Sequence, residues 1–479
     1  MISGRNIKQM FKACDSNPRK FQSEFRKMLG ITQDEKTLQW KISNPQIGAD
    51  EFKIRELTEA LLGQEYISEC AGDSMSSSAA GLMRTSAGYS NAYELQESAV
   101  PVMPSTFQDI SAWNATVGGL VEVRMLAGYR KPMFIGDNFV TTEPTRVMGG
   151  KVILIPDIAP AGEVVKPGVE FPNTGMNEQW VWARENMVYG LDVSLTREDI
   201  VYDLTGQLLA KAESIGAALG YGREYLIGAG VLGLTTPPMT VTGTTANIKT
   251  SLLRQIGSSY RLNESSPTAT PQATYQTTPT LGTSSTLPNA YNYINQLSGG
   301  PFVDWTSLQA VRQQLYLQRD PVNNLPFDME ISTLFVDPYE WDVVARVLHA
   351  SQVFNVTGNP ATSYGPLNQG AGSTFPPVGT LSNGFPANSQ LNGWTAHTSA
   401  IWHQILLDSG VSETNARKYW IAGDPKKAFK WRSAWDLRVD QANPLTSDLL
   451  KKNIVQEWVG QWSGQFLVEE PRRVILVTN

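Results

Sequence analysis

Residues 187–230 read MVYGLDVSLTREDIVYDLTGQLLAKAESIGAALGYGREYLIGAG, and this stretch decides the fold. Its first part alternates apolar and polar residues, which is typical of a half-buried β-strand. Apolar residues then recur close to the 3.6-residue period, which predicts one helix of about six turns that begins at Thr196 or Asp199. The glycines of GAGVLG, residues 228–233, are expected to end it. A strand that leads into a long helix is therefore the expected centre of the molecule.

Downstream, the pattern predicts a compact section of alternating helix and strand. Asp304 is expected to cap a helix that carries Leu308, Val311 and Leu315 on one face. The next elements are a buried strand at 331–336 and a helix that starts at Asp337 and Pro338 and carries Trp341, Val344 and Leu348. Further strands are expected at 419–422, 454–462 and 474–477. No internal repeat is evident.

Upstream, two strand-like stretches, Lys151–Ile155 and Gln179–Arg184, flank the sequence IAPAGEVVKPGVEFPNTG. The prolines and glycines of that sequence forbid a regular sheet interior, so we expect a long two-stranded projection. A lone ribbon of two strands is marginal in water. It should therefore lie on another surface, and Trp180 and Trp182 are candidate contacts with a second subunit because aromatic residues are favoured at interfaces.

The first 70 residues are expected to form a separate helical segment. Asn17 and Pro18 predict the start of a helix whose apolar stripe includes Phe21 and Phe25 and which stops at Gly30. Residues 1–30 hold seven basic and two acidic side chains. Two roles stay open: docking of the stripe on a neighbouring subunit, with Phe21 and Phe25 as contacts, or contact of the basic excess with a polyanion. The regular stripe favours docking.

Several stretches look like surfaces that meet protein rather than water. Residues 71–118 are mostly small and polar, as in an extended arm that lies across a neighbour. Residues 265–295 and 355–396 contain no charged side chain, yet they include aromatic residues, which suggests loops that pack against protein. Charged residues make up 18% of the chain, against roughly 25% in ordinary soluble domains.

Composition and motifs argue against several functions. The net charge of −6 gives no strong field for nucleic acid or an anionic membrane, and the pattern shows neither a membrane span nor a signal sequence. The motif at 228–233 follows a helix instead of preceding one, so it is not a dinucleotide fingerprint. Three histidines and two cysteines form no metal pattern, and no nucleophile elbow occurs. We therefore expect no enzyme activity, no cofactor and no metal.

Taken in order, these features resemble the major capsid proteins of tailed bacteriophages, with the Hong Kong 97-like fold. The segment 187–230 is similar to the joint between E-loop and spine helix in that family. Residues 304–348, DWTSLQAVRQQLYLQRDPVNNLPFDMEISTLFVDPYEWDVVARVL, are similar to its A-domain, and YWIAGDPKKAFKW and EEPRRVILV to its closing strands. The resemblance covers residues 75 to 479.

The resemblance implies an α+β fold with six parts. They are a helical segment (1–70), an N-arm with the start of the P-domain (71–140), the E-loop (141–188), the spine helix of the P-domain (189–234), an A-domain with two insertions (235–435) and C-terminal strands that complete the P-domain (436–479). It also implies that copies form hexamers and pentamers of an icosahedral shell around packaged double-stranded DNA. Lys166 would lie at the tip of the E-loop, as a further candidate for contact between subunits.

Further partners implied by the resemblance are a portal vertex and decoration proteins, with no membrane. The expected location is the virion capsid, and the host cytoplasm during assembly. Two alternatives remain open. An encapsulin-type compartment shell shares the fold and holds cargo instead of a genome. An enzyme with an unrecognised site would elute as a small oligomer instead of a shell.

Overall fold

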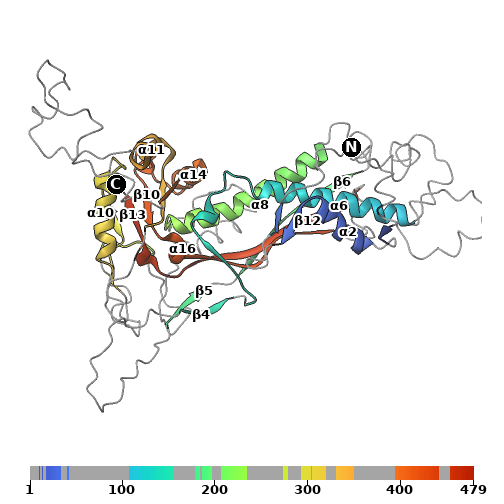
Figure 1. Cartoon of the computed structure of the whole chain (residues 1–479), viewed down its shortest axis with the longest axis horizontal. Coiled ribbons are helices and arrows are strands. Elements are labelled where there is room, and N and C mark those ends of the chain that lie inside the picture. The colour runs from blue at the N-terminus through green and yellow to red at the C-terminus, as the bar shows by residue number, and fades with distance from the viewer. Residues whose placement is uncertain are drawn as a thin grey trace, which may run out of the picture.

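The computed structural model shows a chain of mixed helix and sheet, in agreement with the expected α+β class (Figure 1). It describes residues 10, 13–14, 18–33, 40–42, 107–147, 149–154, 179–183, 186–196, 207–234, 273–278, 293–303, 305–319, 329, 331–349, 394–441 and 454–478. Within these residues, no helix has the length and apolar character needed to cross a membrane.

The main body consists of two long helices on a four-stranded sheet (Figure 1). Helix α6 spans Phe107–Tyr129 and helix α8 spans Gln207–Val231. The sheet has the order β3-β11-β12-β6, with β3 parallel to β11 and the other pairs antiparallel. Its strands are β3 (Thr141–Pro144), β6 (Met187–Thr196), β11 (Phe429–Gln441) and β12 (Ile454–Val468).

Helices α6 and α8 touch through their backbones. A Cβ atom added to Gly216 of α8 would lie 2.0 Å from the carbonyl oxygen of Met125, and one on Gly220 would lie 2.5 Å from that of Tyr129. On α6, a Cβ atom on Gly128 would lie 2.1 Å from the carbonyl oxygen of Glu213. Glycines four residues apart therefore let the two helices pack more closely than side chains would allow.

A five-stranded sheet forms the second layer, in the order β7-β13-β10-β8-β9. Its strands are β7 (Gln296–Ser298), β8 (Thr333–Val336), β9 (Thr395–His397), β10 (Trp420–Gly423) and β13 (Val474–Thr478). The helices of this part are α10 (Trp305–Tyr316), η5 (Pro338–Glu340), α11 (Trp341–His349), α14 (Ala400–Asp408) and α15 (Glu413–Ala416).

The chain passes between the two sheets twice over a short distance. Strand β10 leads through α16 (Pro425–Ala428) into β11, and β12 leads through η7 (Pro471–Arg473) into β13. The two crossings are joined by backbone hydrogen bonds, since Asp424 donates to Arg473 and Glu469 donates to Ala428. The remaining short elements are η4 (Gly136–Asn138), α2 (Pro18–Met28), β1 (Ile31–Gln33), β2 (Trp40–Ile42), β4 (Gly150–Leu154) and β5 (Gln179–Ala183).

Much of the expected local structure is confirmed. The central strand and long helix are β6 and α8, the helix ends at Val231, and Gly233 has the left-handed backbone, φ +65°, that suits a glycine stop. The predicted helices after Asp304 and Asp337 are present, and Asp337 accepts a hydrogen bond from the Tyr339 amide. Of the residues expected on the face of the second helix, Val344 is buried but Trp341 is 38% exposed, so Trp341 does not lie on the inner face.

Some expectations were wrong. Thr196 ends β6, so the long helix does not begin there. Residues 107–118 belong to helix α6 instead of an extended arm. All six residues from Thr116 to Val121 are buried in this helix, so its apolar residues do not form the one-sided stripe that reveals a surface helix. The rest of the expected arm, residues 71–106, lies outside the described residues.

The strands expected at 454–462 and 474–477 are present and lie in two different sheets. Strand β12 lies in the sheet under α8, but β13 pairs with β10 and β7 in the other sheet. Strand β11 begins at Phe429 and pairs with β12. Pairings between strands so far apart in sequence leave no local signal.

Candidate assembly interface

The β4–β5 ribbon has one face that packs on the core of the chain and one that is partly open to solvent. In register, Val152 pairs with Val181 and Lys151 pairs with Trp182. The inner face carries Val181, which is fully buried, and Ala183, and the half-buried Val152 packs against the main core. Side chains alternate between the two faces along a strand. The opposite face therefore carries Lys151 and Ile153 of β4 and Trp180 and Trp182 of β5.

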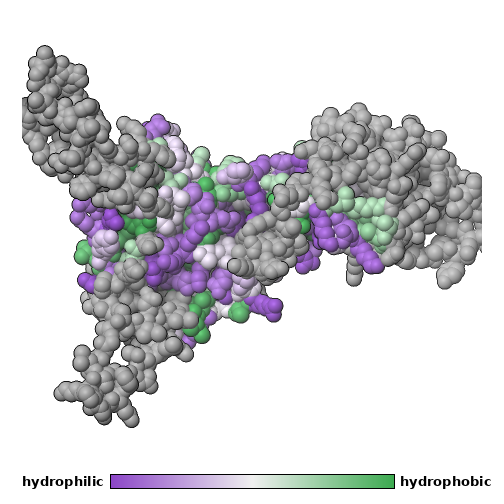
Figure 2. Space-filling view, viewed as in Figure 1, coloured by the Kyte–Doolittle hydropathy of each residue, from purple (hydrophilic) through white to green (hydrophobic). Residues whose placement is uncertain are grey.

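The outer face is apolar and partly open to solvent. Ile153 is 68% exposed, and both indoles are half-buried. The ammonium of Lys151 lies 4.5 Å from the centre of the Trp180 ring and 5.7 Å from that of Trp182, so one cation is attracted to two aromatic faces. Figure 2 shows apolar surface at the edge of the body where Figure 1 places β4 and β5.

The structure therefore brings Trp180 and Trp182 together on one face, as the alternation of strand side chains predicts. Lys166 lies outside the described residues, so its place at the tip of the ribbon stays a prediction.

Phe21 and Phe25 have a different position from the one expected. Phe21 is fully buried and Phe25 is 1% exposed within a single chain, and their rings stack with centroids 5.6 Å apart. Helix α2 packs on α6, where a Cβ atom on Gly119 would lie 2.9 Å from the ring of Phe25. Arg26 also pairs with Glu122 of α6 at 2.8 Å. The apolar stripe therefore packs on the chain's own α6 instead of remaining available for a neighbour.

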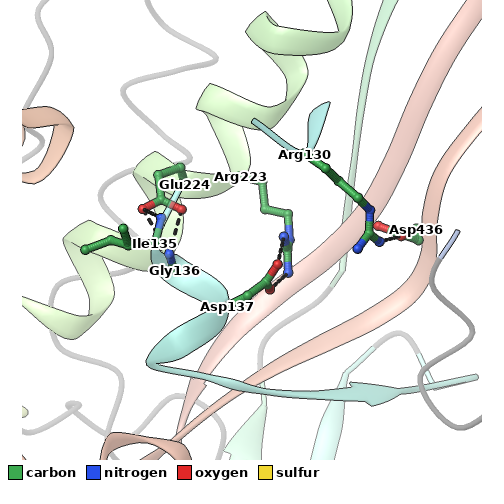
Figure 3. A network of polar contacts seen from close by, with 7 residues as sticks. All are labelled: Arg130, Ile135, Gly136, Asp137, Arg223, Glu224 and Asp436. Atoms are coloured by element: carbon green, nitrogen blue, oxygen red, sulfur yellow. Dashed lines mark hydrogen bonds and ion pairs between the residues drawn. The ribbon is translucent and has the colours of Figure 1, made fainter. Parts of the chain in front are cut away.

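A network of polar side chains joins α8 to the turn after α6, and Figure 3 shows its residues. Arg223 forms a bidentate ion pair with Asp137, and Arg130 Nη2 donates to Asp436 Oδ2 at 2.6 Å. The neighbouring Glu224, 2% exposed, accepts hydrogen bonds from the backbone amides of Ile135 and Gly136.

Glu224 also accepts a hydrogen bond from the indole of Trp402 on α14, with Nε1 to Oε1 at 2.6 Å. Burial raises the pKa of Glu224 from 4.5 to about 6, although the hydrogen bonds from Gly136, Trp402 and Ile135 and the charge of Arg223 lower it. Burial lowers the pKa of the Arg223 guanidinium, but the interactions with Asp137, Tyr129 and Asp436 together outweigh burial and raise the pKa, so Arg223 keeps its charge.

Sequence reasoning missed this network. The available signal was the Arg-Glu pair at 223–224, which interrupts a long apolar helical pattern. Charged residues are almost never fully buried unless they have partners, so such a pair in a core helix indicates a buried ion pair. Within the described part of the chain, no group of three or more His, Cys, Asp or Glu side chains could hold a metal ion.

Comparisons with known proteins found similarity among solved structures. No family model matches the chain, and no curated protein matches it. The chain is similar to a structure of Gordonia phage Cozz, with 14% identity, coverage of 72% of this chain and 86% of that chain, and a TM-score of 0.37. It is also similar to the capsid of a native GTA particle, with 10% identity, coverage of 73% and 90%, and a TM-score of 0.36.

A third similar structure is the capsid of the cyanophage P-SCSP1u, with 14% identity, coverage of 71% of this chain and 85% of that chain, and a TM-score of 0.36.

Proposed function

We propose that this chain is a structural subunit of a capsid shell, of the type of the major capsid proteins of tailed bacteriophages. In this proposal, copies form hexamers and pentamers that close into an icosahedral shell around double-stranded DNA. The observation that carries the proposal is the difference between the two faces of the ribbon. Its inner face is buried against the chain, whereas on its outer face Ile153 is exposed and the two indoles are half-buried.

The energetics of the ribbon favour a second copy as the partner. Full burial of one isoleucine side chain stabilises a contact by about 1.5–3 kcal/mol, and aromatic residues are among the strongest anchors of protein interfaces. In a closed shell each subunit would both present its ribbon and receive that of a neighbour. Modest energies per contact then add up over many copies.

The division into parts follows from the same proposal. The ribbon would be the E-loop, α8 with the four-stranded sheet the P-domain, and the five-stranded sheet the A-domain. The β13 strand would then belong to the A-domain. The buried Tyr275 and Tyr293, which are 7% and 3% exposed, support the expectation that the uncharged stretch 265–295 packs against protein.

The test is assembly of the full-length chain and of two variants at one position. Purified wild-type protein should form closed particles in negative-stain images and elute at megadalton size. Ile153→Asp should leave a folded but unassembled subunit, because the side chain is exposed in the single chain and a carboxylate would be desolvated in the contact. Ile153→Val, which keeps the apolar surface, is the matched control and should assemble.

A wild-type chain that stays a small oligomer under all assembly conditions would refute the shell proposal. Normal shells from Ile153→Asp would refute the role of the ribbon face. The content of particles from the natural source tests whether the shell encloses DNA. Nuclease-protected DNA inside the particles would support the capsid proposal, while protein cargo without DNA would support the compartment-shell alternative.

A further inference from the structure

Three polar side chains lie in one row across the four-stranded sheet, level with the root of the ribbon. Arg432 of β11 is opposite Gln465 of β12 in register. The pairing of Gly464 with Met187 brings Asn186, the residue before β6, to the position beside Gln465. Asn186 ends the link from β5 to β6, so the row lies where the ribbon is joined to the sheet.

The hydrogen bonds of this row are incomplete although its side chains are buried. Arg432 is 8% exposed, Gln465 7% and Asn186 8%. Among the described residues, no partner is present for Arg432 Nε, for either amide atom of Gln465 or for Asn186 Oδ1. Buried polar groups are hydrogen-bonded as a rule, so unpartnered atoms gathered in one row require an explanation.

Arg432 also places a charge in the row. Its neighbour in register on β3 is Glu143, but the ion pair of Glu143 among the described residues is with Lys430, at 3.6 Å. Burial lowers the pKa of the Arg432 guanidinium, and the charge of Glu143 offsets this only in part. A buried cation without an ion pair is unfavourable, so Arg432 adds to the cost of covering the row.

The contacts that hold the root of the ribbon are few. Arg432 Nη2 donates to Thr145 Oγ1 at 2.7 Å, and Asn186 Nδ2 donates to the Val147 carbonyl at 3.4 Å. Figure 1 shows β4 and β5 on the side of β11 and β12 that faces away from α8. The inner face of the ribbon, with the fully buried Val181, packs on the core. Apolar burial therefore favours this position of the ribbon, while the row opposes it.

We propose that the ribbon is a detachable element of the subunit, which lifts from the sheet by turning about its root at Thr145 and Asn186 while the rest of the fold stays intact. In the seated position the row leaves polar atoms without partners. In the lifted position water reaches those atoms and hydrogen-bonds to them, so each unpartnered atom shifts the equilibrium towards lifting. This inference concerns the single subunit and does not depend on assembly.

Hydrogen exchange of the unassembled full-length chain tests the proposal. The amides of β4 and β5 should exchange together, much faster than those of β11 and β12, because lifting is a local opening. Their exchange rates should also depend only weakly on low concentrations of urea, because lifting exposes far less surface than unfolding. Ribbon amides that are as protected as those of β11 and β12 would overturn the proposal.

Gln465→Met is the variant that addresses the row, since methionine keeps the length of the side chain without its amide. Removal of an unsatisfied buried amide should raise the protection of the ribbon amides about tenfold. Gln461→Met is the matched control. Gln461 lies on the same strand and the same face, but its Nε2 donates to Asp440 Oδ2 at 2.6 Å, so its replacement should not raise ribbon protection.

Val181→Ala acts on the opposing term. Loss of buried apolar surface should weaken the seated position, so protection of the ribbon amides should fall about tenfold. Unchanged or lower ribbon protection in Gln465→Met would show that bound water satisfies the amide in the seated position and would overturn the proposal. An equal rise in Gln461→Met, or unchanged protection in Val181→Ala, would overturn it as well.

Discussion

The contact between α6 and α8 predicts opposite effects from the same substitution at two glycines of one helix. In Gly216→Ala, the new Cβ atom would lie 2.0 Å from the Met125 carbonyl oxygen and 2.7 Å from its carbonyl carbon. Non-bonded heavy atoms settle near 3.5 Å, so the helices must separate by about 1 Å or more. Both sides of the contact are backbone, so no rotamer change can relieve it.

The magnitude follows from two opposing terms. Overpacking a well-filled interface typically costs about 1–3 kcal/mol, and a backbone contact belongs at the upper end. Alanine is better than glycine in a helix by about 1 kcal/mol. Gly216→Ala should therefore lower the free energy of unfolding by about 2 kcal/mol. Gly222→Ala is the control, because a Cβ atom there meets nothing within 4 Å, and it should raise that free energy by up to about 1 kcal/mol.

Urea unfolding of the unassembled full-length chain, followed by far-UV circular dichroism, measures both variants. Should Gly216→Ala express poorly, Gly119→Ala supplies a milder case, because its Cβ atom would meet the Phe25 ring at 2.9 Å and a ring can turn aside. If Gly216→Ala were as stable as the wild type, or if Gly216→Ala and Gly222→Ala shifted the midpoint in the same direction, the close backbone packing would be refuted.

Two further substitutions test other parts of the core. Phe25→Ala should cost about 3–5 kcal/mol in the same unfolding experiment, because the ring is 1% exposed; an effect seen only on assembly would instead favour docking on a neighbour. Gln465→Leu should stabilise the chain by about 1–3 kcal/mol, because both amide atoms of Gln465 are buried without a hydrogen-bond partner among the described residues; a loss of stability would show that the amide is satisfied by bound water.

Local structure was predictable where one face of an element differs from the other. The alternation in 187–196 and the long helical pattern after it correspond to β6 and α8, and the paired strands of the ribbon were expected from their flanking prolines and glycines. Helix α6 was not predictable in this way, because a helix buried on most sides shows no apolar stripe. Its Gly118, Gly119 and Gly128 look like loop residues but serve close packing.

The candidate site was only partly accessible from sequence. The face shared by Trp180 and Trp182 follows from the two-residue period of a strand, and no tertiary knowledge is needed. The Glu224 carboxylate accepts hydrogen bonds from Ile135, Gly136 and Trp402, which are separated from it by 89, 88 and 178 positions in the sequence. Only the fold brings such distant residues together, so sequence could at most have marked the buried Arg223–Glu224 pair as one that requires partners.

The two helices of the main body and the two sheets are held together by different kinds of contact. At the closest approaches of α6 and α8 the atoms that meet are backbone atoms, and the ion pair between Arg124 and Glu213 also joins the two helices. The joint to the second sheet relies instead on two short chain crossings and on the hydrogen bond from the Trp402 indole of α14 to Glu224 of α8.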